Sequence, residues 1–354
     1  MDLCLSEYFR SHKSLGANDR RKVGEAIYVL VRWKSLFDCL EPFNSSFKRL
    51  SLYHQKSIEE WRKDPRVEEA ARFGLSPFLF KKILTAYGPD NGRELAEALN
   101  TTAPTAVRAN LLKITREELL QKWEGRFSIS PSLRSPTALL FSKREPLFAL
   151  PEFKEGLFEV QDEGSQCIAD LIEAKSGDRI LDYCSGSGGK SLAIAPGMKG
   201  KGELYLHDIR TSSLDEAKRR LRRAGVQNAQ LLPPDHPTLS KLLGKMDWVL
   251  VDAPCTGTGT LRRNPDMKWK IDAPMVERLV EEQRKIFTQA LRYLKPEGKI
   301  VYATCSILPE ENRSQVEFFL HTLPLVLERE LHLLPEIGGC DGFFAAVFRK
   351  CGKR

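Results

Sequence analysis

The sequence lacks the patterns that would place it in a membrane or build a metal centre. No stretch approaches the roughly 20 consecutive apolar residues of a membrane-spanning helix, and the N-terminus, MDLCLSEYFRSHKS, has no region resembling a secretory signal. The eight cysteines form no CxxC pair and the six histidines no HExxH pattern, so no structural zinc site is expected. We therefore expect a cytoplasmic, monomeric protein with reduced thiols and no metal or membrane partner.

Positive charge is unevenly distributed along the 354 residues. The formal net charge is +8, and residues 1–150 hold 25 Lys and Arg against 18 Asp and Glu, whereas residues 151–354 hold 30 against 29. A basic N-terminal part beside a nearly neutral remainder favours an anionic partner, nucleic acid first, although a solvated basic surface gives the same count.

Capping residues mark helices in the first hundred residues. In SPFLFKKILTAYG, Ser76 suits the N-cap, Pro77 the first turn and Gly88 the end of a helix. The stretch NDRRKVGEAIYVLVRWKSLFDCL has apolar residues at helical spacing, and GRELAEALN continues the helical pattern. We predict a helical N-terminal region over residues 1–74, with further helices following it.

Strands and helices mix from Pro104 onward. TAVRANLL, ALLF and GLFEVQ predict strands, and TREELLQKWEG predicts a helix in which Thr115 and Glu118 form a capping box. We predict a small α+β subdomain over residues 75–155.

The alternation becomes regular in residues 156–354. Strands are predicted at RILDYC, ELYLHD, AQLL, DWVLVD and GKIVYATC, with helices between them. This pattern predicts an α/β fold, in which a parallel sheet carries helices on both faces. Ligands of such sheets bind beyond the carboxyl ends of the strands, so the candidate site residues are those that follow these strands.

A glycine-rich loop follows the first of these strands. LDYCSGSGGKS places Gly186, Gly188 and Gly189 between a strand and a helix, where backbone N–H groups can approach a ligand closely. One interpretation is an ATP-binding P-loop, G-x4-G-K-[ST], but Cys184 occupies the position of its first glycine.

The other interpretation is an adenosine cofactor site. Asp208 closes the next strand, 26 residues after Asp182, which is about where an acid that binds ribose hydroxyls is expected. Asp235 follows the third strand and is a candidate for adenine contact. A tight turn and a solvated strand end would explain the same residues without a ligand. We favour a nucleoside cofactor over ATP.

Two cysteines follow two of the predicted strands. Cys255 comes after the strand that ends at Asp252, and Cys305 comes 50 residues later, after IVYAT. A lone cysteine there is commonly a small buried hydrophobe, but two indicate a thiolate site. Pro309 is predicted to begin a helix whose N-terminus favours the thiolate form.

Such a site suits cytosine chemistry. A thiolate that adds to C6 of cytosine makes C5 nucleophilic toward a methyl donor. Asp252 could contact the N3/N4 edge of the base, and the second thiol could assist release of the product. The chemistry alone does not decide which of the two cysteines attacks.

Five motifs occur in an order that resembles one enzyme family. VQDEGSQ, LDYCSGSGGKS, VLVDAPCTGTGTLRRNPDMKW, YATCSILPEEN and DGFFAAVFRK look like those of the NOL/NOP/Sun family of RNA cytosine-C5 methyltransferases, most closely its bacterial Sun (RsmB-like) branch. The resemblance implies a Rossmann-like sheet and S-adenosylmethionine as cofactor. It also implies methyl transfer to C5 of a cytosine through a covalent bond between a cysteine and C6. The substrate that the bacterial Sun branch implies is small-subunit (16S) ribosomal RNA.

The same resemblance assigns roles to individual residues. Cys305 is expected to be the nucleophile and Cys255 to assist product release, with Asp252 and Lys190 beside the base. The cofactor site that the resemblance implies consists of Cys184, Ser185, Gly186, Ser187, Gly188, Gly189, Lys190, Asp208, Asp235 and Asp252.

Two features depart from the family pattern. The first loop usually reads Cys-Ala-Ala-Pro-Gly-Gly-Lys, whereas this chain has CSGSGGK, with Ser187 in place of the proline. Because the substituted residues are small, we expect cofactor binding to survive with a looser loop. The bacterial enzymes also carry an N-terminal domain resembling the antitermination factor NusB, and residues 1–74 look like a truncated version of it.

Candidate RNA contacts follow Cys255. Arg262, Arg263, Lys268 and Trp269 suit phosphate contact and base stacking, although a solvated loop with Trp269 in the core is the alternative. The basic run at residues 218–223 fits ordinary surface equally well. Two other functions stay open: a tRNA cytosine-C5 methyltransferase, and a non-catalytic RNA-binding ribosome assembly factor that keeps the fold.

Overall fold

The computed structural model describes residues 1–43 and 45–351 and divides the chain into two compact units. The helical unit comprises residues 1–102, 260–275 and 335–337, and the sheet unit comprises the rest. The predicted boundary between residues 74 and 75 therefore differs from the division in the structure, which falls after Thr102. Residues 352–354, the end of the predicted 156–354 domain, lie outside the described residues.

Short helices build the helical unit. They are α1 (Asp2–Ser11), α2 (Ala17–Arg32), α3 (Lys34–Leu40), α4 (Ser46–Gln55), α5 (Ile58–Trp61), α6 (Glu69–Arg72), α7 (Pro77–Tyr87), α8 (Pro89–Ala98) and the 3-10 helix η4 (Pro265–Trp269). Buried Trp33, Leu36, Phe37, Trp61 and Val67 pack together as a core of this unit. Helix α7 has the predicted ends, because the Ser76 hydroxyl accepts from Leu79 N at its start and Gly88 adopts φ +81° at its end.

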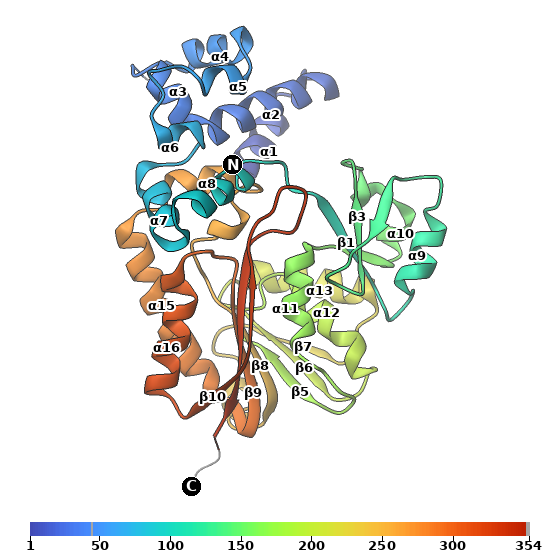
Figure 1. Ribbon diagram of the computed structural model, residues 1–354. Helices are drawn as coiled ribbons and strands as arrows, with labels where there is room; N and C mark the ends of the chain where they lie inside the picture. The colour runs from blue at the N-terminus through green and yellow to red at the C-terminus, as the bar shows by residue number, and fades with distance from the viewer. Residues whose placement is uncertain (44, 352–354) are drawn as a thin grey trace. The chain divides into compact units, whose positions relative to one another are not determined.

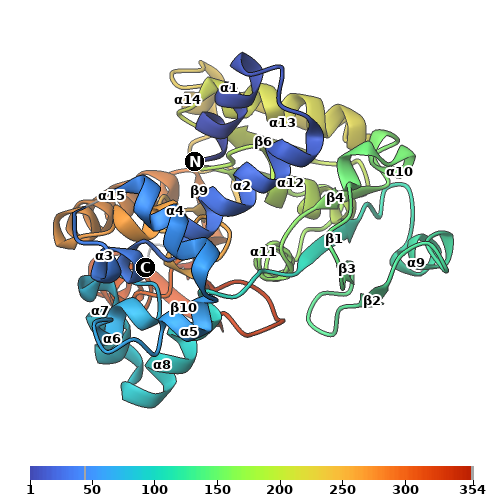
Figure 2. The ribbon, with the colours of Figure 1, turned by 90° about the horizontal axis from the view of Figure 1, so that it is seen from above.

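A small antiparallel sheet opens the sheet unit. Its strands are β1 (Thr105–Ala109), β2 (Ile129–Pro131), β3 (Ala138–Phe141) and β4 (Phe158–Val160), with α9 (Arg116–Lys122), η1 (Leu147–Ala149) and α10 (Pro151–Lys154) between them. The spatial order β2-β3-β1-β4 and the β-α-β-β-α-β succession are those of a ferredoxin-like fold (Figure 2). The predicted capping box of Thr115 and Glu118 begins α9. The sequence patterns did not predict β2.

A mixed seven-stranded sheet forms the larger part of the sheet unit. Its strands are β5 (Arg179–Asp182), β6 (Glu203–His207), β7 (Ala229–Leu232), β8 (Met246–Asp252), β9 (Leu294–Thr304), β10 (Leu325–Leu333) and β11 (Phe343–Lys350), in the order β10-β11-β9-β8-β5-β6-β7. Strands β5 to β9 are parallel, whereas β10 and β11 pair antiparallel at one edge. The predicted Rossmann-like α/β class is confirmed.

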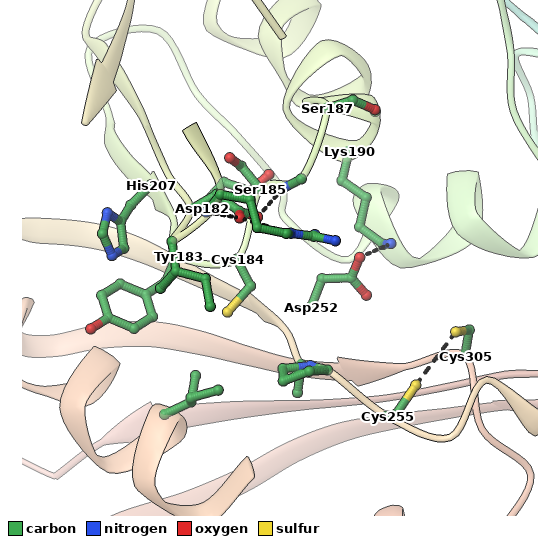
Figure 3. A pocket seen from close by; sticks show the side chains of 18 of the residues that line it. Asp182, Tyr183, Cys184, Ser185, Ser187, Lys190, His207, Asp252, Cys255 and Cys305 are labelled. Atoms are coloured by element: carbon green, nitrogen blue, oxygen red, sulfur yellow. Dashed lines mark hydrogen bonds and ion pairs between the residues drawn. The ribbon is translucent and has the colours of Figure 1, made fainter. Parts of the chain in front are cut away.

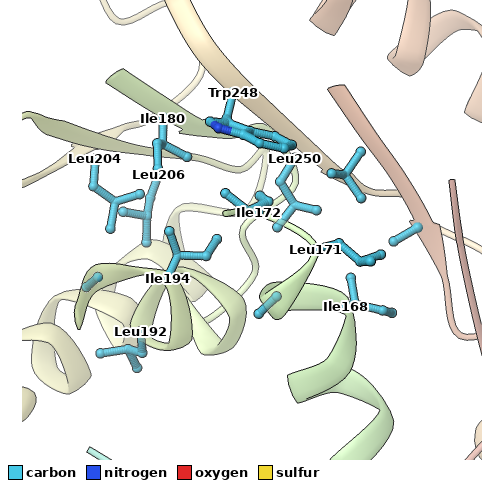
Figure 4. Packing of buried hydrophobic residues seen from close by; sticks show 14 of the residues in the cluster. Ile168, Leu171, Ile172, Ile180, Leu192, Ile194, Leu204, Leu206, Trp248 and Leu250 are labelled. Carbon is cyan, nitrogen blue, oxygen red and sulfur yellow. The ribbon is translucent and has the colours of Figure 1, made fainter. Parts of the chain in front are cut away.

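Helices cover both faces of this sheet (Figure 1). One face carries α11 (Glu163–Asp170), α12 (Gly189–Ile194), η2 (Ala195–Met198) and α13 (Thr211–Ala224), and the other carries α14 (Thr238–Lys241), α15 (Ala273–Leu291) and α16 (Arg313–Thr322). Figure 4 shows Ile180, Leu206 and Trp248 of the strands against Ile168 and Ile194 of the helices. The central strands are apolar on both sides because both faces are covered.

The chain order reverses beside β5. From β5 the chain continues through β6 to β7, and it then crosses to the other side of β5 to form β8 and β9. Such a switch point leaves a crevice at the carboxyl ends of the adjacent strands.

Among the helices that the structure describes, none is long and apolar enough to cross a membrane.

Candidate active site

A cavity of about 730 Å³ lies at the switch point, within the sheet unit. Its walls come from the segments that follow β5, β6, β8 and β9, with further residues from α13, α15 and the end of β4. The predicted site residues among its lining are Cys184, Ser185, Gly186, Ser187, Gly189, Lys190, Asp208, Asp252, Cys255 and Cys305. This volume is in the range of small-molecule and cofactor sites.

The glycine loop enters the cavity in a conformation that requires glycine. Gly186 and Gly188 have φ of +52° and +78°, and a Cβ at Gly188 would lie 3.1 Å from Leu206. The carboxylate of Asp208 accepts from Gly186 N at 2.8 Å and from Arg210 N at 2.8 Å. Asp208 thus lines the cavity as predicted and also holds the loop.

Two buried oxygen atoms at the cavity have no hydrogen-bond partner among the described residues. Asp182 accepts from the Ser191 hydroxyl at 2.7 Å through Oδ2, but its Oδ1 is unsatisfied, as is Ser185 Oγ. Burial raises the pKa of Asp182 to about 7, with a smaller rise from Asp252. Because buried polar atoms are normally paired, this cavity fits a ligand that brings N–H or O–H donors, as a nucleoside cofactor does.

A lysine and an aspartate form an ion pair beside the loop. Lys190 Nζ donates to Asp252 Oδ2 at 2.6 Å, and Figure 3 shows the pair between the loop and the two cysteines. Burial alone would lower the pKa of Lys190, but the charge of Asp252 and its hydrogen bond outweigh burial, so that pKa is raised. Lys190 therefore stays cationic in the lining of the cavity.

The two predicted cysteines meet in the cavity. Cys255 Sγ and Cys305 Sγ are 3.4 Å apart, within hydrogen-bond distance for sulfur (Figure 3). The hydrogen bond with Cys255 lowers the pKa of Cys305, against burial, and Lys190 lowers it further. The same bond and burial raise the pKa of Cys255 well above its ordinary range. Cys305 is therefore the more readily ionised thiol of the pair.

A buried polar network fixes the loop that carries Cys255. Glu311 accepts from Thr256 N at 2.9 Å and from Thr256 Oγ1 at 2.5 Å. Gln283 donates to Pro254 O at 3.0 Å and to Glu311 at 2.9 Å, so the peptide groups on both sides of Cys255 are held. The sequence patterns did not single out Glu311 or Gln283, although Glu311 belongs to the PEEN motif. Pro309 begins a three-residue 3-10 helix, η5 (Pro309–Glu311), and the α-helix starts only at Arg313.

Two predicted cofactor residues, Gly188 and Asp235, are not among the residues that line the cavity. Asp235 is exposed, has φ +62° and is not among the lining residues. The adenine contact of Asp235 therefore stays a prediction, which the lining of the cavity does not support.

The predicted RNA contacts belong to the helical unit. Lys268 is fully buried and donates to Asn100 Oδ1 and to Gly74 O, and Arg262 is 2% exposed. Trp269 Nε1 donates to Val31 O at 2.7 Å. Both cations are buried, and Lys268 donates to acceptors of the protein, so a phosphate contact of either residue stays a prediction that their burial does not favour. Arg263 and Trp269 are half-buried.

The basic residues of α13 include two that form buried ion pairs and one that is exposed. On α13, Arg220 and Arg223 pair with the buried Glu159 at 3.0 and 2.6 Å, whereas Arg219 is exposed. In the part of the chain that the structure describes, no group of three or more His, Cys, Asp or Glu residues could hold a metal ion.

The sheet and its cavity define a Rossmann-type fold with a crevice of cofactor size, which two thiols line. Comparison with known families then identifies the group. The family model described as 16S rRNA methyltransferase RsmB/F matches residues 169–349, and that of the RsmF/B-like ferredoxin-like domain matches residues 76–147. The chain belongs to the RsmB/F methyltransferase family. This confirms the resemblance on which the sequence interpretation rested, and a methyltransferase family indicates S-adenosylmethionine as the cofactor.

Individual relatives agree with the family. Ribosomal RNA small subunit methyltransferase B of Photorhabdus laumondii is 34% identical over 291 residues, covering 77% of this chain and 66% of the relative. The protein of the same name from Shewanella oneidensis is 34% identical over 257 residues, covering 71% and 59%. The match thus spans less than two thirds of the length of these relatives. A methyltransferase homolog protein from Pyrococcus horikoshii, 26% identical, has a TM-score of 0.71, covering 79% of this chain and 97% of that one.

Proposed function

We propose that this chain transfers a methyl group from S-adenosylmethionine to C5 of a cytosine in small-subunit ribosomal RNA. The observation that carries the proposal is the pair of thiols, Cys255 and Cys305, 3.4 Å apart at the cavity that Lys190 and Asp252 also line. The names of the relatives, ribosomal RNA small subunit methyltransferase B, support ribosomal RNA as the substrate class. The target base must leave its stack to reach such a cavity.

S-adenosylmethionine, when bound, supplies an electrophilic methyl group. The glycine loop, Asp182 and Ser185 would hold it, because their unsatisfied oxygens and the positive-φ backbone line the cavity. Asp208 keeps the loop in place through its bond with Gly186 N.

The directions of the two thiol pKa values support the roles that the resemblance implies. Cys305, whose pKa is lowered, adds as the thiolate to C6 of cytosine, which makes C5 nucleophilic. The Asp252 carboxylate, held by Lys190, would accept from the amino group of the base and orient it. After methylation the C5 proton leaves, the C6–S bond breaks and its electron pair returns to Cys305. Cys255 assists this release from its neighbouring position.

The activity is tested by incubating the protein with labelled S-adenosylmethionine and unmodified ribosomal or transfer RNA, then mapping 5-methylcytosine. Label in ribosomal RNA is expected. Label only in transfer RNA would move the substrate class, and no label in either pool would leave a non-catalytic RNA-binding protein as the better explanation.

The thiol roles are tested by separate substitutions. Cys305→Ala should abolish both methylation and covalent attachment to RNA. Cys255→Ala should instead accumulate a protein–RNA adduct on a denaturing gel. Cys4→Ala, at an exposed cysteine of the helical unit, is the matched control and should behave as wild type. The opposite pattern for the first two variants would exchange the roles.

A further inference from the structure

The cofactor loop lacks two restraints that would hold it in shape. Ser187 is not a proline, so no pyrrolidine ring fixes φ at this position. Gly186 adopts φ +52°, and a Cβ built there would meet nothing within 4 Å, so the space beside this turn is open. The Asp208 carboxylate holds Gly186 N, but it does not contact Ser187.

An arginine from a neighbouring helix holds Ser187 instead. Arg220 of α13 donates through one terminal nitrogen to Ser187 O at 3.0 Å and to Ser187 Oγ at 2.7 Å. Arg220 lines the cavity, and its guanidinium and the Gln161 amide both lie 3.8 Å from a Cβ built on Gly189. Ser187 lies on the loop just before the helix that carries Lys190 (Figure 3).

The other edge of the same guanidinium is anchored to a buried carboxylate. Arg220 Nε and its second terminal nitrogen donate to Glu159 Oε2 at 3.2 and 3.0 Å. Glu159 is 3% exposed, lies on β4 of the ferredoxin-like sheet and also accepts from Arg223 at 2.6 Å. The planar fork of arginine can bond both sides at once, which a lysine cannot do with the same geometry.

We propose that Arg220 is a positioning residue that joins the cofactor loop to Glu159 and sets the affinity of the loop for S-adenosylmethionine. This inference rests on the proposed function, because it assigns the loop to that cofactor. The loss of one hydrogen bond to a charged group changes an equilibrium constant on the order of 10-fold, so the loss of this link should weaken cofactor binding on the order of 10-fold. Arg220 makes no bond to Cys255 or Cys305, so kcat should change little while KM for the methyl donor rises.

The test measures S-adenosylhomocysteine binding by calorimetry. Arg220→Gln should bind on the order of 10-fold more weakly than wild type, and Arg220→Lys should fall between them. Ser187→Ala removes the hydroxyl bond alone, keeps the carbonyl bond and leaves the buried pair with Glu159 intact, so a smaller loss is expected. The matched control is Arg219→Gln on the same helix, whose arginine is 71% exposed and pairs only with Glu216.

The possible outcomes distinguish failure of the Arg220 inference from failure of the proposed function. Wild-type protein that does not bind S-adenosylhomocysteine overturns both. Wild-type binding together with unchanged affinity in Arg220→Gln overturns the inference alone, as does a kcat that falls with KM unchanged. If Arg220→Gln does not fold, Ser187→Ala decides: weaker binding supports the link, and unchanged affinity overturns it.

Discussion

The buried carboxyl of Asp182 should make the cofactor-free protein less stable as pH rises. Asp182 is 1% exposed, and burial raises its pKa to about 7, whereas an unfolded chain has an Asp pKa of about 3.9. Between these two values the folded chain keeps a proton that the unfolded chain has lost. The free energy of unfolding therefore falls through this window and levels off above the folded pKa.

The size of the effect follows from the difference between the two pKa values. About 3 pKa units at 1.36 kcal/mol each give ~4 kcal/mol in total, of which about 3 kcal/mol is lost between pH 5 and pH 8. Asp182→Asn keeps the shape of the side chain and an amide oxygen that can accept from Ser191, but it does not ionise. The substituted protein should lack this part of the pH dependence and be the more stable of the two at pH 8.

Urea unfolding of cofactor-free wild type and Asp182→Asn at pH 5, 6, 7 and 8 checks this prediction. The difference between the two proteins at each pH isolates Asp182, because the other titrating groups are common to both. Parallel curves, with the same difference in unfolding free energy at every pH, would refute the assignment of a neutral carboxyl in the folded state.

Three further substitutions test other parts of the structure. Lys268→Met should lower the free energy of unfolding by about 1–3 kcal/mol, because it leaves the buried acceptors of Asn100 and Gly74 unpaired. The salt dependence of RNA binding should not change in this variant, whereas the loss of a phosphate contact would lower the slope of that dependence by about 1. Gly156 has φ +72°, and Gly156→Ala would place a Cβ against the carbonyl oxygen of Arg223. This substitution should lower the unfolding free energy by about 2–4 kcal/mol, and an unchanged Tm would contradict the close contact between Gly156 and Arg223. Glu311→Gln should slow product release and accumulate the RNA adduct on a denaturing gel, and adduct at the wild-type level would show that this carboxylate does not position the cysteine loop.

Local patterns predicted the parts of this molecule whose causes are local. Ser76 and Gly88 end α7 as expected, and Thr115 caps α9, because caps depend on residues three or four positions apart. The parallel strands were predicted from apolar runs, and the cysteines were placed at the crevice because parallel strands end at one edge. Strands β10 and β11 complete the sheet by antiparallel pairing, which depends on partners distant in the chain.

The charged residues were predicted less well, for a physical reason. Lys268 and Arg262 look like surface cations in sequence, but non-local acceptors allow their burial. Glu159 looks like an ordinary strand residue, although it is the buried anchor for two arginines. Asp235 follows a strand as Asp208 does. Asp208 accepts a hydrogen bond from the backbone N–H of Gly186 and lines the cavity, whereas Asp235 is not among the lining residues.

The discontinuity of the helical unit has a consequence for synthesis on the ribosome. Its last segment, Pro335–Ile337, is made 235 residues after Thr102. At roughly 5–20 residues per second, this delay lasts about 10–50 s. Within that time, the acceptors on Val31 and Asn100 receive their bonds only after Lys268 and Trp269 have been made, 166 and 167 residues after Thr102. The helical unit therefore cannot complete its packing before the sheet unit emerges, but only after Ile337 has been made.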